Sequence, residues 1–467
     1  MREPVFVSTQ ALEEGRAAVL RLREALRGRS LHYYIESYGC QMNDHDSEKL
    51  AGMLAQIGYQ RAASKEEADL VLFNTCCVRE HAEKRVFGNV GALKKQKEAR
   101  PGLCVAVCGC MMQQAEVAAR LYKRFPFVDL VFGTNALHRF PLLLEEALCG
   151  ERVLAVSQSD GEIAEGLPVL RGSAFSTNVT IMYGCDNYCT YCIVPYVRGR
   201  ERSRKSQSIL QEVRELAQAG YKEITLLGQN VNSYRGDGGA VDFPALLHRV
   251  HEVEGIARIR FMTSHPKDLS PGLIGAMAEL PKVCKHIHLP VQSGSSRILA
   301  AMNRRYARAD YLSLVAALRE KVPGIEITTD IIVGFPGESE ADFQDTLGLV
   351  EAAGFSAAYT FMYSPRLGTA AAKMEGQIDE AVKKERLARL NEEIGRVVRR
   401  NNQKFLGREG EVLVEGCDRR GEETLAYGKL SCFKMVYFPG SEALVGKLCP
   451  VRITATQANS LTGELLN

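Results

Sequence analysis

The sequence predicts an α/β protein with an open parallel α/β domain at the N-terminus, a partial (β/α)6 barrel in the middle and a small antiparallel β-barrel at the C-terminus. The first observation behind this fold class is the length of 467 residues, which is too great for one ordinary domain. Apolar strand-like stretches and helix-like stretches also alternate in two separate regions, as they do in parallel sheets covered by helices. The last part of the chain instead has short alternating strands separated by Gly and Pro.

The N-terminal part begins with an extension, residues 1–30, in which Ala11 to Arg27 has the charged, Ala- and Leu-rich pattern of a surface helix. Residues 31–150 form the parallel domain. Polar or amphipathic segments between its strands are expected to be helices, the first capped by Asn43 and Asp44. Its expected strands are HYYIESYGC, ADLVLFNTC, LCVAVCGC and VDLVFGTN.

The second region of alternation follows a linker. Residues 151–176 contain Gly and Pro without periodicity and are expected to connect two domains. Residues 177–401 carry the strand-like stretches NVTIMY, EITLLG, RIRFMT, KHIHLPV, ITTDIIVGF and AAYTFMY. These six units fit an open, partial barrel better than the eight of a complete barrel.

The C-terminal part, residues 402–467, follows a charged helix that runs from about Glu380 to Lys404. Its expected strands are EVLVEG, TLAYGK, KMVYF and LCPVRITAT. From Asn402 on it has eight Lys or Arg and eight Asp or Glu, so its composition alone does not indicate RNA binding. Its strands are expected to pair among themselves.

Composition restricts the class of protein. Hydrophobic residues make up 46% of the chain and charged residues 25%, as in soluble globular proteins, and no apolar run is long enough to cross a bilayer. The N-terminus lacks the apolar core of a signal peptide, so we expect a cytoplasmic protein with no membrane partner. A net charge of +3 neither demands nor excludes a nucleic-acid partner.

The 14 Cys are the most informative residues. A reducing cytoplasm disfavours disulfides, so clustered Cys there indicate metal or redox chemistry. About half of the Cys are expected to be small buried apolar residues instead. That group includes Cys149, Cys284, Cys417, Cys432 and Cys449.

The strongest signal is the spacing Cys185-x3-Cys189-x2-Cys192, directly after the first strand of the central barrel. Thiolates suit iron–sulfur clusters or zinc. A structural zinc site requires four protein ligands, and no fourth Cys or His follows nearby. Three thiolates on a four-iron cube leave one iron open to a small molecule, and catalytic groups in such folds lie at the carboxyl ends of barrel strands. We therefore expect these three Cys to hold a catalytic cluster.

A second, dispersed set consists of Cys40, Cys76 and Cys110, each at the carboxyl end of an expected strand of the first domain. The carboxyl edge of an open α/β sheet is where ligands bind, so thiols far apart in sequence can converge on one cluster there. Cys77 and Cys108 are competitors. Cys77 should point away from Cys76, and Cys108 lies inside its strand rather than at its end.

The first set, with Tyr191 before the last Cys, resembles the radical S-adenosylmethionine (SAM) superfamily. In that superfamily the open iron binds SAM, and an electron from the cluster cleaves SAM to methionine and a 5′-deoxyadenosyl radical. The resemblance implies Cys185, Cys189 and Cys192 as ligands of a 4Fe–4S cluster. It also implies SAM contacts from the strand ends. The expected contacts are Tyr191, Gly228, Gln229, Asn230, Ser264, Gln292, Val333 and Gly334.

A closer resemblance covers nearly the whole chain from Tyr34. It rests on YGCQMNDHDSE, NTCCVRE, GCMMQ, YGCDNYCTYC and VPYVRGRERSR, which are similar to the methylthiotransferase family. GQNVNSY, TSHP, HLPVQSGS and DIIVGFPGE resemble its MiaB subfamily, which acts on isopentenylated adenosine in tRNA. The resemblance implies Cys40, Cys76 and Cys110 as ligands of an auxiliary 4Fe–4S cluster. Cys77 departs from the smaller residue expected there, which leaves a choice between Cys76 and Cys77.

The resemblance implies a reaction that transfers a methylthio group to carbon 2 of the isopentenylated adenine next to the anticodon of tRNA. It uses SAM both as methyl donor and as radical source, because this C–H position is unactivated and requires cofactor chemistry. The implied partners are the tRNA, a reductant such as flavodoxin or ferredoxin, and a sulfur donor or cluster-assembly proteins. The family's C-terminal barrel is a TRAM domain, which binds RNA.

The run VRGRERSRK beside the cluster loop is a candidate for binding RNA phosphates through Arg198, Arg200, Arg202 and Arg204. An ordinary solvated charged loop is the alternative. Other functions also stay open: methylthiolation of threonylcarbamoyl-adenosine in tRNA, methylthiolation of an aspartate on a ribosomal protein, or an iron–sulfur RNA-binding sensor without catalysis.

Overall fold

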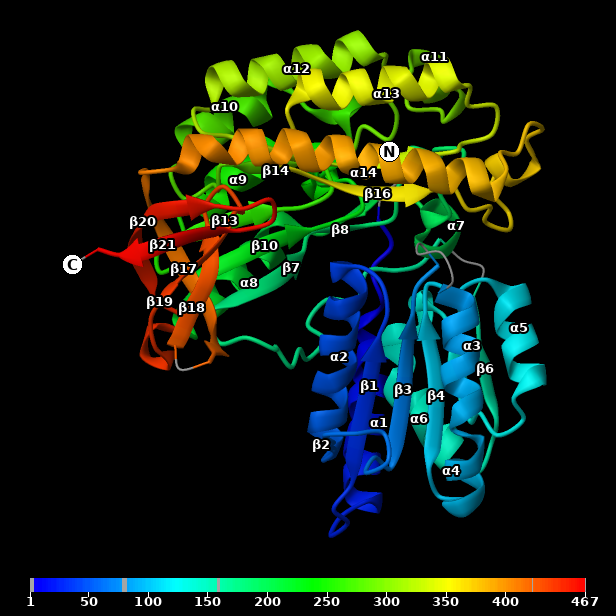
Figure 1. Ribbon diagram of the computed structural model, residues 1–467. Coiled ribbons are helices and arrows are strands. Elements are labelled where there is room, and N and C mark those ends of the chain that lie inside the picture. The colour runs from blue at the N-terminus through cyan, green and yellow to red at the C-terminus, as the bar shows by residue number, and fades with distance from the viewer. Residues whose placement is uncertain (1–3, 78–81, 158–159, 422, 467) are drawn as a thin grey trace. The chain divides into compact units, whose positions relative to one another are not determined.

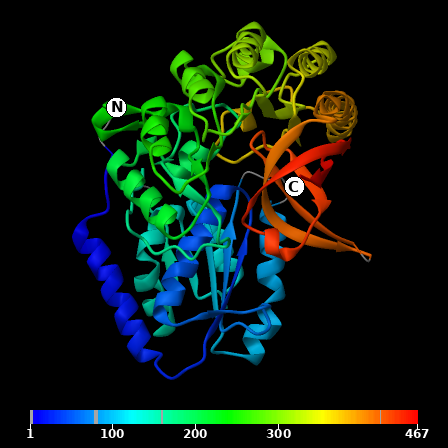
Figure 2. The ribbon, with the colours of Figure 1, turned by 90° about the vertical axis from the view of Figure 1, so that its left-hand side faces the viewer.

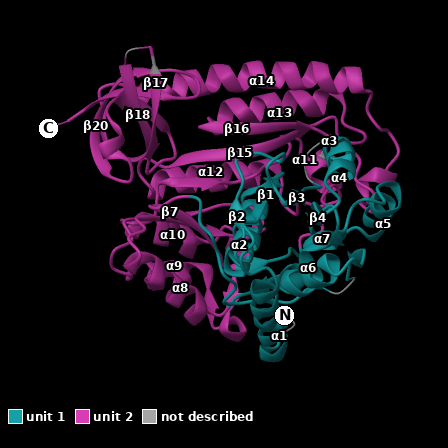
Figure 3. Cartoon of the chain, turned by 90° about the horizontal axis from the view of Figure 1, so that it is seen from below, with its two compact units in different colours: residues 1–172, 182–186, 193–204 teal, residues 173–181, 187–192, 205–467 magenta. Residues whose placement is uncertain are grey.

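The computed structural model describes residues 4–77, 82–157, 160–421 and 423–466 (Figure 1). The chain divides into two compact units, which Figure 3 colours separately. Unit 1 comprises residues 1–172, 182–186 and 193–204, and unit 2 comprises residues 173–181, 187–192 and 205–467. Within the described ranges, no helix is both long and apolar enough to cross a membrane.

Unit 1 contains a parallel sheet whose strand order, in the described part of the chain, is β2-β1-β3-β4-β5-β6 (Figure 1). The strands are β1 (His32–Ser37), β2 (Gln60–Arg61), β3 (Leu70–Thr75), β4 (Cys104–Gly109), β5 (Leu130–Phe132) and β6 (Val153–Ala155). The expected parallel sheet is confirmed. The sequence did not predict β2 and β6, because stretches of two or three residues carry no readable periodicity. Strand β6 lies in the segment that was expected to be a linker.

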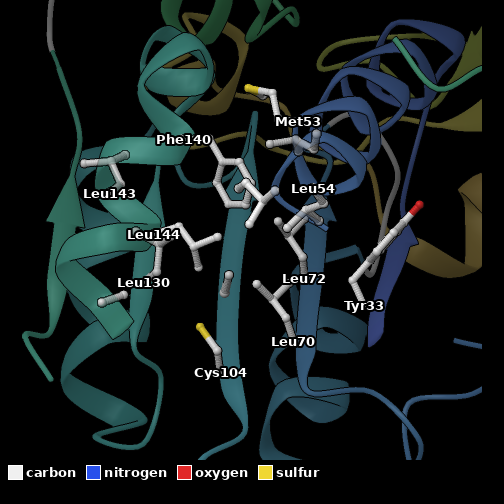
Figure 4. Close-up of a cluster of buried hydrophobic side chains, with 14 of the residues drawn as sticks. Tyr33, Met53, Leu54, Leu70, Leu72, Cys104, Leu130, Phe140, Leu143 and Leu144 are labelled. Atoms are coloured by element: carbon white, nitrogen blue, oxygen red, sulfur yellow. The ribbon is translucent and has the colours of Figure 1, made fainter. Parts of the chain in front are cut away.

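Helices cover both faces of this sheet. They are α1 (Thr9–Ala25), α2 (Gln41–Ile57), α3 (Ala82–Ala92), α4 (Lys94–Ala99), α5 (Ala115–Arg124) and α6 (Phe140–Leu148). Part of the segment between β3 and β4, which was expected to be helical, lies outside the described residues. Strand β3 is buried along its whole length, and its side chains alternate between two apolar cores. Leu70 and Leu72 face residues of α2 and α6 (Figure 4), whereas Val71 and Phe73 face residues of α3 and α5.

Unit 2 contains the central barrel strands. They are β7 (Ser176–Thr180), β10 (Glu223–Leu227), β13 (Arg258–Phe261), β14 (His286–His288), β15 (Glu326–Val333) and β16 (Ala357–Met362). They form two parallel sheets, β13-β10-β7 and β14-β15-β16, which an isolated parallel bridge between Ile259 and Val283 joins. The expected partial barrel is confirmed, because six parallel strands follow one another in chain order.

Helices follow the barrel strands. They are α8 (Ser206–Gln218), α9 (Phe243–His251), α10 (Pro271–Glu279), α11 (Ser296–Ala301), α12 (Arg308–Lys321), α13 (Glu340–Ala353) and α14 (Glu380–Asn402). Helix α13 shows why they form: Ser339 and Asp342 make a reciprocal capping box at its start, and Gly354 ends it with a left-handed φ of 55°. Figure 2 views α14 nearly along its axis, beside the C-terminal barrel that follows it.

The C-terminal barrel is closed, with the strand order β17-β18-β19-β21-β20. Its strands are β17 (Glu409–Arg420), β18 (Glu423–Leu430), β19 (Met435–Pro439), β20 (Leu448–Thr456) and β21 (Leu461–Leu465). Strand β21 was not predicted. It pairs parallel with β19, so the barrel is antiparallel except at this one seam.

The barrel is anchored to the central strands within unit 2 by two buried arginines. Arg260 pairs with Glu223 at 2.8 Å and donates to the backbone oxygens of Leu430 at 2.9 Å and Ser431 at 3.0 Å. Arg258 donates to the backbone oxygen of Lys429 at 2.7 Å. Loss of the barrel would therefore leave two buried guanidinium groups without these acceptors.

We expect Arg260→Gln to lower the stability of unit 2 by about 3–5 kcal/mol, because it leaves the buried Glu223 carboxylate without its cation. Urea unfolding of the full chain measures this. Arg452→Gln is the control, because the pair between Arg452 and Glu409 is about half exposed and should contribute under about 1 kcal/mol. Equal unfolding midpoints for the two variants would show that Arg260 does not anchor the barrel.

Candidate iron–sulfur and SAM sites

The dispersed Cys set lies at one edge of the unit 1 sheet. Two of the three directly follow strands: Cys76 follows β3 and Cys110 follows β4. The third, Cys40, lies three residues after the end of β1. These three strands are neighbours in the sheet. Thr75 pairs with Gly109 across β3 and β4, which places the following Cys76 and Cys110 on adjacent strand ends. Cys76 and Cys110 are buried, and Cys40 is exposed at the start of α2.

Asn43 ties these strand ends together. Its amide nitrogen donates to the backbone oxygens of Tyr38 at 2.9 Å and Thr75 at 2.8 Å. Its amide oxygen lies 3.4 Å from Cys110 Sγ. Because Asn43 is fully buried, these bonds are shielded from water and fix the loops that carry all three Cys. Asn43 was expected from the sequence only to cap a helix, but α2 begins at Gln41, so Asn43 lies inside its first turn.

Gly39 explains how Cys40 approaches the other strand ends. It has a φ of 113°, and a Cβ added to it would lie 2.5 Å from both Cβ and Sγ of Cys76. Only glycine therefore fits at this position, directly before Cys40. The close approach of this backbone to Cys76 brings the loops after β1 and β3 together.

Cys77, which the sequence left as an alternative ligand to Cys76, contacts Cys110. It hydrogen-bonds Cys110, and both pack with Ile193 and Val197 in one small apolar cluster. Cys76 instead belongs to the apolar core on the α3 and α5 face. The hydrogen bond from Cys77, with support from the Arg198 guanidinium, lowers the pKa of the Cys110 thiol to about 6. A thiolate is the form that binds iron, so this donor set fits a thiolate-ligated cluster.

Among the residues the structure describes, no three His, Cys, Asp or Glu side chains are gathered closely enough to hold a single metal ion. The thiolates of a four-iron cube stand farther apart than the ligands of one ion.

We expect Cys76→Ala to remove the auxiliary cluster and Cys77→Ala to retain it, because Cys76 immediately follows the strand end next to Cys40. Iron analysis of each anaerobically reconstituted variant measures this, with Cys104→Ala as the control because Cys104 is buried at the opposite end of β4. The reverse result would assign the ligand to Cys77.

The other Cys set, Cys185, Cys189 and Cys192, lies in the loop between β8 (Met182–Tyr183) and α7 (Val194–Arg198). The division between the two units falls inside this loop, after Asp186. On the unit 1 side, the backbone nitrogen of Cys185 donates to Gly199 at 3.2 Å. On the unit 2 side, the nitrogen of Cys192 donates to the oxygen of Cys189 at 2.9 Å, which makes a tight turn between these two ligands.

Arg304 supports the unit 2 part of the loop and was not found from the sequence. Its guanidinium is buried and lies 3.4 Å from both Cys189 Sγ and the Tyr191 hydroxyl. A third contact, 2.6 Å to the backbone oxygen of Pro290, fixes its orientation. A buried cation beside Cys189 favours the thiolate that a cluster requires. Arg304 stands in MNRRY, a stretch with no sequence signal that would have identified it.

The strand ends near this loop offer buried polar atoms with no hydrogen-bond partner among the described residues. They include Gln229 Oε1 after β10, and Ser264 Oγ and His265 Nε2 after β13. Buried polar atoms are almost always paired, so unpaired ones at the carboxyl ends of barrel strands are suited to a polar ligand. Gln229 and Ser264 were expected SAM contacts, and His265 was not predicted.

The remaining expected SAM contacts differ in what they can offer. The side chain of Asn230 is engaged, because it donates to Asp268 at 2.7 Å and accepts from the nitrogen of His265 at 3.0 Å. The side chain of Val333 is fully buried, so only its backbone can reach a ligand. Gly334 has a φ of 71°, and a Cβ there would lie 2.3 Å from Lys383 Cγ, so the position requires glycine.

Gly228 directly follows β10 and precedes Gln229.

Gln292 has a φ of 75°, which is rare outside glycine and marks strain of about 1 kcal/mol or more. Two backbone hydrogen bonds hold it there. The backbone nitrogen of Gln292 donates to the backbone oxygen of Asp330, and its backbone oxygen accepts from the backbone nitrogen of Ile332, both at 2.9 Å. This strained strand end fits a residue that is shaped for ligand binding.

The arginine run differs most from expectation. Arg198, Arg202 and Arg204 are 6–8% exposed, and each is bound to partners in unit 1. Arg204, for example, pairs with Glu165 at 3.0 Å. Direct contact of these three with RNA phosphates does not fit their burial. Arg200 is exposed and pairs with Asp186 at 3.3 Å, so it is the one of the four that lies at the surface.

Three family models match this chain. Residues 32–133 match the uncharacterized protein family UPF0004, residues 179–350 the radical SAM superfamily, and residues 403–466 the TRAM domain. Solved structures of the radical SAM methyltransferase TsrM from Kitasatospora setae share the fold, with 14% identity over 73% of this chain and 75–77% of theirs, at TM-scores of 0.52 and 0.53. The fold and the three-Cys loop thus define a radical SAM protein.

Curated relatives specify the class further. A protein from Thermoanaerobacter sp. (strain X514) is 50% identical over 99% of this chain and 98% of its own length. One from Alkaliphilus oremlandii (strain OhILAs) is 51% identical over 100% of this chain and 99% of its own length. Both are named tRNA-2-methylthio-N(6)-dimethylallyladenosine synthase. The chain belongs to this family.

Proposed function

We propose that this protein methylthiolates carbon 2 of N6-isopentenyladenosine next to the anticodon of tRNA. The observation that carries the proposal is the presence of two separate thiol sets, one at the carboxyl edge of the unit 1 sheet and one in the loop after β8, in a chain that is about half identical to such synthases along its length. A single thiol set would suffice for SAM cleavage alone. The second set supplies the separate sulfur chemistry that methylthiolation needs.

The roles of the residues follow from their places. Cys185, Cys189 and Cys192 hold one 4Fe–4S cluster, and Cys40, Cys76 and Cys110 hold the other. When bound, the clusters and SAM supply the methyl group, the sulfur site and the radical that removes hydrogen from an unactivated carbon. Gln229, Ser264 and the backbone around Gly334 bind and orient SAM at the strand ends, where the apolar packing around Tyr191 and Phe335 excludes water.

The RNA contacts belong to the TRAM barrel, residues 403–466, and to the exposed Arg200. The target adenine must leave the anticodon-loop stack to reach the strand ends. We also propose the domain division 31–150, 177–401 and 402–467, a cytoplasmic location, a flavodoxin- or ferredoxin-type reductant, and a sulfur donor or cluster-assembly protein as partners.

The test is a comparison of substrates. The reduced, reconstituted enzyme is given SAM and anticodon hairpins that carry isopentenyladenosine, threonylcarbamoyl-adenosine or plain adenosine. We expect methylthiolated product from the first hairpin only. Product from the second hairpin instead would move the chain to the sister reaction. SAM cleavage without product from any hairpin would favour a ribosomal-protein substrate, and no SAM cleavage at all would favour a non-catalytic sensor.

A further inference from the structure

The short helix α7, which follows the loop of Cys185, Cys189 and Cys192, carries a fully paired arginine that contacts the dispersed Cys set. Arg198 lies at the end of α7 and belongs to unit 1, as do the dispersed Cys. It is 6% exposed, although the charged run that contains it is typical of a solvated loop. A cation in this environment is costly unless it is fully paired, so its partners indicate its purpose.

The guanidinium of Arg198 makes three distinct contacts. Its Nε lies 3.2 Å from Cys110 Sγ, its Nη2 lies 2.7 Å from Asn43 Oδ1, and its Nη1 lies 2.8 Å from Asp46 Oδ2. The last two contacts hold the planar group on both sides. They leave the Nε–H directed at the sulfur of an expected cluster ligand.

Two charged side chains besides Arg198 lie near the contact between Arg198 and Cys110. Asp46 balances Arg198, but Lys49 lies 3.8 Å from the same carboxylate and is itself 6% exposed. The guanidinium nevertheless contacts Cys110 Sγ directly, so it acts on this sulfur more strongly than the Asp46 carboxylate does. Asn43 cannot replace Arg198, because its oxygen facing Cys110 only accepts hydrogen bonds and a thiolate has no hydrogen to donate.

We propose that Arg198 is a positioning residue that orients the Cys110 thiolate and raises the reduction potential of the cluster bound there. This inference rests on the proposed function, since it requires Cys110 to be a cluster ligand. Net charge and hydrogen bonds to the sulfurs are among the factors that set the potential of an iron–sulfur cluster. The N–H···S bond and the local positive charge both favour the reduced, more negative state.

The competing explanation is purely structural: Arg198 would merely neutralise the buried Asp46. The two explanations separate when both charges of the pair are removed together, because no unpaired carboxylate then remains to unfold the site. The variant is Asp46→Asn with Arg198→Gln. It is placed in the Cys185→Ala, Cys189→Ala, Cys192→Ala background, so that only the auxiliary cluster is observed.

The measurements are the iron content and the midpoint potential of the reconstituted protein, the latter by a redox titration followed by electron paramagnetic resonance. We expect the double variant to keep its iron and to titrate at a more negative potential, and Arg198→Lys, which keeps the charge, to shift less. The matched control is Arg204→Gln with Glu165→Gln, another largely buried pair from the same segment. Its potential should equal that of the background.

An unchanged potential in the double variant would overturn the proposal. Loss of iron from a double variant that is still folded by circular dichroism, with iron retained by Arg198→Lys, would support it, because the cation would then be needed to hold the ligand. If Arg198→Lys also lost all iron while the Arg204 control kept it, charge would not be what matters and the potential-tuning role would fail. A background protein that binds no iron would instead refute the auxiliary cluster of the proposed function.

Discussion

Replacing Cys185, Cys189 and Cys192 together by Ala is expected to lower the iron content from about eight to about four per chain and to abolish SAM cleavage, because the three thiolates bind a four-iron cluster whose open iron holds SAM. Iron analysis after anaerobic reconstitution measures the first effect. Chromatography of 5′-deoxyadenosine after reduction with dithionite measures the second.

The control for this variant removes three Cys that belong to neither of the two expected cluster-binding sets. Cys149→Ala, Cys417→Ala and Cys449→Ala in one chain should keep all the iron and full SAM cleavage. A Cys185, Cys189 and Cys192 variant that retained all its iron would show that the loop does not bind the cluster.

Replacing Cys40, Cys76 and Cys110 together by Ala should spare SAM cleavage and abolish methylthiolation. This variant should also lose about four irons, yet still form deoxyadenosine, because its SAM site is assigned to other residues in other strands. It should make no methylthiolated tRNA, since the sulfur site is gone. Nucleoside mass spectrometry of isopentenylated tRNA measures the product.

Methylthiolated product from that variant would contradict the auxiliary-cluster assignment. A variant that lost SAM cleavage as well would show that the two sites depend on each other. The Cys77→Ala protein is the natural comparison, because it removes a neighbouring thiol at the same sheet edge.

The convergence of the dispersed Cys set could be predicted because parallel strands end at a common edge. Cys76 and Cys110 lie on neighbouring strand ends, as the pairing of Thr75 with Gly109 shows. The choice between Cys76 and Cys77 could not be predicted, because the chain leaves strand geometry at this point and alternation no longer says where each thiol points.

The burial of Arg198 could not be read from the sequence either. Five cations within VRGRERSRK are typical of a solvated loop, and the partners of Arg198 come from α2 and from the end of β4, far away in the chain. The anchoring role of Arg260 escaped for the same reason: its backbone acceptors lie about 170 residues later. Long-range partners of single charged residues leave no periodic trace.

The most direct test of the central claim is a doubly labelled single reaction. The enzyme is given SAM with a trideuterated methyl group and an anticodon hairpin whose isopentenyladenosine carries deuterium at carbon 2. The account predicts a methylthio product that contains the labelled methyl group, together with 5′-deoxyadenosine that has gained deuterium from the base. A product without the labelled methyl group, or deoxyadenosine free of deuterium, would contradict it.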